Sequence, residues 1–114
     1  MTFEECLKQY DAIIDTLPEI DRLGKTMPYT SSNTYMYSLV NKAGEMGIRM
    51  SKEDQAEFSA TYPGTEVYKS YGAVMKDYVL IPEDLLSNTE LVGSYLRKGL
   101  TYVNSLKPNP RKKK

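Results

Sequence analysis

Histidine is absent from this 114-residue chain, and cysteine occurs once, at position 6. Without an imidazole, Ser-His-Asp catalysis, Cys-His catalysis and histidine-ligated zinc are all excluded. A single cysteine forms neither an internal disulfide nor a thiolate metal cluster. Cys6 falls on the apolar stripe of an expected helix, which favours a buried, unreactive thiol. We therefore expect a non-enzymatic protein with no catalytic residues, no cofactor and no metal site.

Long hydrophobic runs are missing as well. No apolar stretch approaches the roughly 20 residues that a membrane-spanning helix needs. The first residues include Glu4 and Glu5, whereas a signal peptide begins with basic residues. A chain of this length is large enough for one hydrophobic core. We expect a single-domain cytoplasmic protein that has no membrane partner.

Charge is balanced overall but unevenly distributed. The chain has 15 basic and 15 acidic residues, and five of the basic residues lie within positions 107–114. We expect residues 1–106 to form one mildly acidic domain and residues 107–114 to form a basic, disordered tail. The tail residues that could contact nucleic acid are Arg111, Lys112, Lys113 and Lys114. The acidic body argues against a dedicated DNA-binding domain, which would carry basic clusters on its folded elements.

Three helix starts are marked by Ser or Thr followed three residues later by an acidic residue, the pattern of a capping box. The pairs are Thr2 with Glu5, Ser51 with Asp54, and Ser87 with Glu90. Apolar residues at helical spacing predict a helix over residues 3–17 and a long one after Ser87. The middle helix is short and ends near Tyr62, where Pro63-Gly64 breaks it.

Between the helices, runs of β-branched, aromatic and alternating apolar residues predict strands. The expected ranges are 25–30, 34–40, 45–50, 66–70 and 75–81. Turn residues at 31–33, 41–44 and 71–72 separate consecutive strands, and such short connections favour antiparallel pairing. The order α-β-β-β-α-β-β-α therefore predicts an α+β fold. We expect a two-layer α/β sandwich, with a five-stranded antiparallel sheet and the helices on one face.

The stretch Lys76-Asp77-Tyr78 places three reactive groups side by side. Neighbouring residues of a strand point to opposite faces, so Lys76 and Asp77 cannot act together as an acid–base pair. We interpret this stretch as part of the last strand.

Tyrosine is abundant, with ten residues against no tryptophan. If the aliphatic face of each strand packs against the helices, the outer face of the sheet carries a tyrosine-rich, basic surface. Its expected members are Tyr35, Tyr37, Arg49, Lys76 and Tyr78. Tyrosine and arginine are enriched at the centres of protein interfaces, so this surface is a candidate partner-binding or homodimer site. Two alternatives stay open: the tyrosines merely cover the sheet, or the two faces are assigned the wrong way round.

Several short stretches resemble the TfoX N-terminal domain family over essentially the whole chain. They are Thr26–Tyr29, Asn33–Tyr37, Met46–Met50, Gly72, Met75–Val79 with Pro82, and Ser105–Pro108 before the lysine-rich tail. The resemblance implies a bacterial protein with a two-layer α/β fold similar to type III secretion chaperones. Some relatives carry a second domain and regulate competence genes with other transcription regulators. The family supplies no catalytic residues.

Two features set this chain apart from that family pattern. Family members often have Met-Phe-Gly-Gly where this chain has Met27-Pro28-Tyr29-Thr30, and the second domain is missing. We expect a small protein-interaction or regulatory domain that binds a partner or itself through the open sheet face. The alternatives are an accessory transcription or competence factor that contacts nucleic acid through its tail, and a small-ligand-binding protein.

Overall fold

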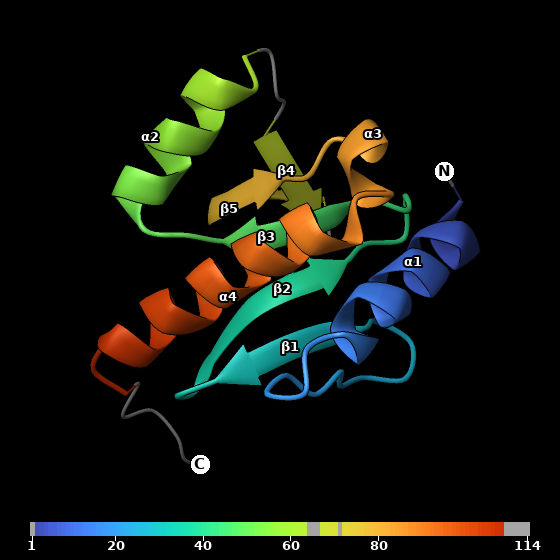
Figure 1. Ribbon diagram of the computed structural model, residues 1–114, viewed down its shortest axis with the longest axis horizontal. Helices are drawn as coiled ribbons and strands as arrows, with labels where there is room; N and C mark the ends of the chain where they lie inside the picture. Colours follow the sequence, from blue (N-terminus) through green and yellow to red (C-terminus); the bar gives the residue numbers. More distant parts are fainter. Residues whose placement is uncertain (1, 64–66, 71, 109–114) are drawn as a thin grey trace.

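The fold is α+β, as the sequence predicts, in a computed structural model that describes residues 2–63, 67–70 and 72–108 (Figure 1). A five-stranded antiparallel sheet has the strand order β1-β2-β3-β5-β4. Figure 1 shows α1 and α4 in front of the sheet, where both contact β2. The elements are α1 (Phe3–Asp15), β1 (Tyr29–Ser32), β2 (Tyr35–Val40), β3 (Met46–Arg49), α2 (Lys52–Thr61), β4 (Val67–Ser70), β5 (Ala73–Leu80), α3 (Glu83–Leu86) and α4 (Thr89–Ser105).

Two of the three predicted helix starts are confirmed. Thr2 and Glu5 form a reciprocal capping box at the start of α1, and the Ser51 hydroxyl accepts a hydrogen bond from the Asp54 N–H at the start of α2. The third prediction is wrong by one residue. Asn88, and not Ser87, caps α4, because the short helix α3 ends at Leu86 and takes Ser87 as its own C-cap.

The core lies between the sheet and the helices. Met46 and Ile48 of β3, with Met50 just after it, belong to the core, as their alternation predicts, and all three are fully buried. Gly99 brings α4 against this strand so closely that a side chain there would meet the Arg49 carbonyl oxygen at 2.8 Å. Helix α2 joins the same layer through Phe58, whose ring lies 5.2 Å from that of Tyr95 on α4.

The β1–β2 hairpin differs from the sequence prediction in its turn and in its register. The turn is the pair Asn33-Thr34, both with positive φ, so Ser31 and Ser32 belong to β1. Thr30 pairs with Ser38 but Ser31 pairs with Met36, so Tyr37 is an extra residue in β2. Such a bulge interrupts the alternation of side chains along a strand.

The β4–β5 hairpin folds over the outer face of the sheet. The pairing of β4 with β5 is irregular: Val67 pairs with Val79, but Lys69, only two residues later, pairs with Val74. Asp77, in the part of β5 between these partners, has a φ of 72°. Strand β4 accordingly lies behind β5 in Figure 1. The buried ring of Tyr68 occupies the space above Gly47 that a side chain would fill.

Both terminal strands of the sheet are hydrogen-bonded to segments outside it. Leu23 and Tyr29 exchange two backbone hydrogen bonds beside β1. The Asn41 amide, in the loop between β2 and β3, donates to the Lys69 carbonyl of β4 at 2.6 Å. Among the described residues, no helix has both the length and the apolar character needed to cross a membrane.

Candidate functional site

The structure does not bring the five predicted partner-binding residues together on one outer face. Tyr37 is only 2 % exposed and belongs to the core between the sheet and the helices. The bulge explains the error, because it turns both Tyr37 and Ser38 toward the helices. Tyr37 lies beside Gly99 of α4, and the Ser38 hydroxyl bonds the Tyr10 hydroxyl of α1 at 2.6 Å.

Two of the five residues lie on the β5 side of the sheet. Lys76 is exposed next to the bend at Asp77. Tyr78 lies across the outer face, where its hydroxyl donates to the Met36 carbonyl at 2.8 Å and its ring stacks on Tyr68. Burial raises the pKa of Tyr78 to about 12. The contacts of Tyr78 therefore hold β5 to β2 across β3.

The remaining two residues, Tyr35 and Arg49, meet near the C-terminal end of α4. The Arg49 guanidinium lies 5.3 Å from the centre of the Tyr35 ring and 5.9 Å from that of Tyr102. We call Tyr35, Arg49 and Tyr102 the arginine–tyrosine cluster. Tyr35 begins β2 and Arg49 ends β3, so the antiparallel pairing of these strands and the crossing of α4 bring the three together.

Each member of the arginine–tyrosine cluster is held in place by a rigid element. The Tyr35 hydroxyl donates to the Lys107 carbonyl at 2.7 Å, just beyond the end of α4. Asn33 ties the same end of the helix to the β1–β2 turn by donating to the Val103 and Leu106 carbonyls. The two rings are therefore positioned before any partner arrives, which lowers the entropic cost of binding.

Arg49 is unusual because its guanidinium lacks hydrogen bonds. Its Nε atom is buried with no hydrogen-bond partner, and Nη2 lies 3.9 Å from Asp77 Oδ2, an ion pair without a hydrogen bond. Within the described part of the chain, the two Nη groups have no hydrogen-bond acceptor. The Arg49 side chain is 24 % exposed, so solvent reaches it only in part. Buried polar groups are nearly always hydrogen-bonded, which makes this arginine an exception that needs a reason.

The arrangement suits the binding of an oxyanion better than it suits catalysis. A guanidinium has five N–H donors in a planar fork that matches a carboxylate or phosphate. Aromatic rings contact the flat faces of a guanidinium, so its N–H groups, which point outward along the edge, can still donate hydrogen bonds. Within residues 2–63, 67–70 and 72–108, no group of three Cys, Asp or Glu side chains is placed to hold a metal ion.

Tyr102 is the member of the arginine–tyrosine cluster that sequence reasoning missed. It follows Tyr95 by seven residues, which is about two helical turns, so both lie on one side of α4. This spacing was the one feature of the sequence that could have indicated a tyrosine-bearing side of the last helix. Pairing with Arg49 required the register of β2 and β3, which no local pattern provides.

The other predicted contact region is the basic tail. Arg111, Lys112, Lys113 and Lys114 lie outside the described residues, so their role in nucleic-acid binding stays a prediction. A scan against protein-family models gives no match, and a search of curated proteins gives none either. The resemblance to the TfoX N-terminal domain accordingly stays a prediction that rests on the motifs of the sequence.

Proposed function

We propose that this chain is a non-enzymatic protein-interaction domain that binds an acidic segment of a partner protein through the arginine–tyrosine cluster. The observation that carries the proposal is the buried Nε of Arg49, which has no hydrogen-bond partner. Leaving a buried charged donor unpaired costs free energy, and a carboxylate that hydrogen-bonds the partly exposed guanidinium beside the tyrosine rings would offset part of that cost.

The chemistry of the cluster supports a protein partner. Tyrosine and arginine are over-represented among residues that dominate binding energy at interfaces. Tyr35 and Tyr102 are both half-buried, so each offers apolar area beside the cation. Asp77 already balances part of the Arg49 charge from 3.9 Å, so a bound carboxylate would have to form true hydrogen bonds to compete.

The outer face of the sheet supports the proposal less well than the arginine–tyrosine cluster does. Tyr68 and Tyr78 cover its centre, and their hydroxyls are already bonded to the Leu39 and Met36 carbonyls of β2. Binding there would require these internal hydrogen bonds to break. Of the five residues predicted from the sequence, the proposed site therefore includes Tyr35 and Arg49.

The expected setting of this activity is the bacterial cytoplasm. The one cysteine is free and fully buried, and burial raises the pKa of its thiol to about 11. A domain of this size fits a regulatory or adaptor role.

A short polyglutamate peptide with blocked ends tests the proposal. We expect it to shift the NMR signals of the Tyr35 and Tyr102 rings in the wild-type protein. Arg49→Gln should weaken binding about tenfold or more, because it removes a charge-assisted, two-pronged hydrogen bond. Arg49→Lys should give an intermediate affinity, since it keeps the charge but loses the fork.

Lys76→Gln is the matched control. It removes the same charge from an exposed lysine outside the cluster and should change the affinity by no more than roughly twofold. The proposal fails if polyglutamate leaves both rings unshifted, or if Lys76→Gln weakens binding as much as Arg49→Gln. Far-ultraviolet circular dichroism of each variant checks that the fold is intact.

A further inference from the structure

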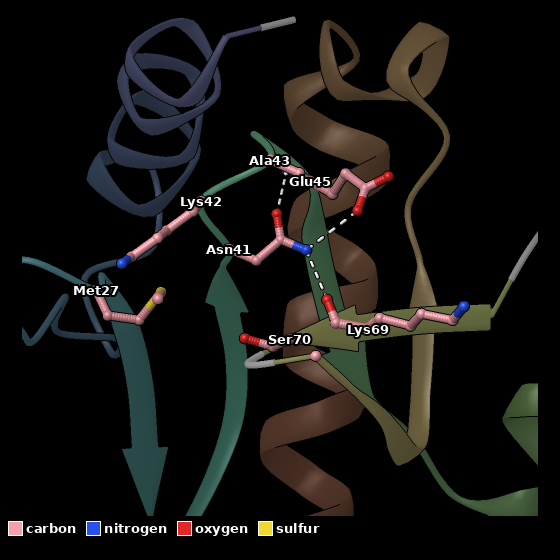
Figure 2. A pocket seen from close by; sticks show the side chains of 8 residues that line it. Met27, Asn41, Lys42, Ala43, Glu45, Lys69 and Ser70 are labelled. Atoms are coloured by element: carbon pink, nitrogen blue, oxygen red, sulfur yellow. Dashed lines mark hydrogen bonds between the residues drawn. The ribbon is translucent and has the colours of Figure 1, made fainter.

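A hollow of about 350 Å³ lies at the end of β2 that leads into β3, the opposite end from the β1–β2 turn, where β4 approaches the loop between β2 and β3 (Figure 2). Three segments that are separate in sequence contribute to its walls. The lining residues are Met27, Asn41, Lys42, Ala43, Glu45, Lys69, Ser70 and Gly72. The arginine–tyrosine cluster contributes none of them. A volume of this size is at the small end of the range for ligand pockets.

The walls of the hollow are fixed by one side chain. The Asn41 amide nitrogen donates to the Lys69 carbonyl at 2.6 Å and to Glu45 Oε1 at 3.1 Å, while its oxygen accepts from the Glu45 N–H at 3.0 Å. Figure 2 shows these three bonds radiating from Asn41. They tie the loop to β4, so the hollow exists without a ligand and needs no rearrangement to form.

Ser70 gives the hollow an unused hydrogen-bonding group. The residue is 4 % exposed, and its hydroxyl has no hydrogen-bond partner among the residues that the structure describes. In Figure 2 the hydroxyl points from β4 toward β2, away from the Lys69 side chain. The fold gains nothing from this hydroxyl, whereas a small residue without one would avoid an unsatisfied polar atom. A bound acceptor would explain why a serine stands there.

The charges around the hollow favour an anion. Lys42 and Lys69 are exposed on its rim, and Glu45, the one carboxylate among the described lining residues, is already bonded to Asn41. Figure 2 shows the two amines on opposite sides and pointing outward, so they attract an anion through their field and need not touch it. Direct hydrogen bonding would come from the Ser70 hydroxyl.

We propose that this hollow binds a small molecule bearing an oxyanion, a carboxylate or a phosphate, that accepts a hydrogen bond from Ser70. The site is independent of the proposed partner-binding site, since the two share no residue. It would make the chain a domain that responds to a small anionic metabolite as well as to a protein.

Titration of the isotope-labelled full chain tests this inference, with acetate and inorganic phosphate as anionic probes and glycerol as a neutral one. We expect one or both anions to shift the backbone amide signals of Asn41, Lys42 and Ser70 in a saturable way, and glycerol to leave them unchanged. If only acetate or only phosphate gives saturable shifts, that result shows whether the hollow prefers a carboxylate or a phosphate. Arg49→Gln should leave this binding unchanged, so it separates the two sites.

Ser70→Ala should weaken anion binding about tenfold, the usual effect of losing a hydrogen bond to a charged group. It should leave the unfolding temperature unchanged or raise it, because an unsatisfied hydroxyl is removed. Ser59→Ala, at an exposed position of α2, is the control for the binding measurement and should leave the anion affinity unchanged. The inference is overturned if neither anion gives a saturable shift, if glycerol shifts the same amides equally, or if Ser70→Ala binds as tightly as the wild type.

Discussion

Gly47 is the position at which a single methyl group should disturb the sheet most directly. It lies in the middle of β3, paired with Leu39 on one side and Leu80 on the other. A Cβ atom at this position would come within 2.5 Å of two ring carbons of Tyr68, closer than real Cβ contacts come. Gly47→Ala therefore forces either the ring or the strand to move.

The structure allows the cost of that movement to be worked out roughly. Tyr68 is fully buried, and its hydroxyl donates to the Leu39 and Glu45 carbonyls, both at 3.2 Å, so the ring cannot swing aside freely. Adding a methyl group to a filled site costs about 1–3 kcal/mol. Replacing glycine by alanine within a strand returns about 0.5–1 kcal/mol. The net loss should be about 1–2 kcal/mol, or roughly 5–10 °C in Tm for a domain of this size.

Thermal and urea unfolding followed by circular dichroism measures this loss. The same substitution in a Tyr68→Leu background supplies the control, because the ring is gone while an apolar side chain remains. The penalty for Gly47→Ala should then fall to less than half, which a double-mutant cycle reports as coupling between the two sites. An equal penalty in both backgrounds, or a gain in stability from Gly47→Ala alone, would refute the reasoning.

Two further predictions concern α4 and the behaviour of the protein at high pH. Gly93→Ala should stabilise the protein by about 0.5–1 kcal/mol through helix propensity, since the nearest atoms to a new Cβ lie 3.6 Å away. Gly99→Ala in the same helix should destabilise it, because the Cβ would lie 2.8 Å from a backbone carbonyl oxygen of β3; urea unfolding checks both. Burial raises the pKa of Tyr78 from 10.0 to about 12, so the contribution of Tyr78 to stability should be constant below pH 10 and be lost between pH 10 and 12. Tyr78→Phe should make the resulting fall in stability shallower in urea titrations across this pH range.

Each of these predictions has a clear contrary result. Equal effects of Gly93→Ala and Gly99→Ala would mean that helix propensity alone decides, and that the close approach of α4 to β3 is unimportant. The sign for Tyr78 follows because the unfolded chain releases its phenolic proton first, which favours unfolding as pH rises. A stability that rises between pH 10 and 12, or a fall that Tyr78→Phe leaves unaltered, would contradict it.

Local patterns in the sequence were sufficient for most of the fold. Capping chemistry located α1 and α2, and alternation identified Met46 and Ile48 of β3 and the following Met50 as core residues. Helix α3 escaped notice because four residues are too few to show helical periodicity. Its presence also moved the cap of α4 from Ser87 to Asn88.

The candidate site was less predictable because it depends on irregularities in two strands. One extra residue in β2 reversed the orientation of Tyr37, and strict alternation cannot anticipate such a bulge. The bend of β5 at Asp77 carried Tyr68 over the outer face that had been expected to stay open. Arg49 and Tyr35 remained candidates, but their meeting with Tyr102 depends on tertiary packing.

The hydrogen bonds at the two margins of the sheet affect how the protein behaves at high concentration. Exposed edge strands are templates for intermolecular pairing and hence for aggregation. Here the backbone of Leu23 is hydrogen-bonded to the backbone N–H and C=O of Tyr29 in β1, and the Asn41 amide donates to the Lys69 carbonyl of β4. Among the described residues the protection is unequal, because a backbone segment shields β1 whereas one side chain shields β4. If Asn41 lost its amide, we expect strand pairing between molecules, and hence aggregation, to begin at β4.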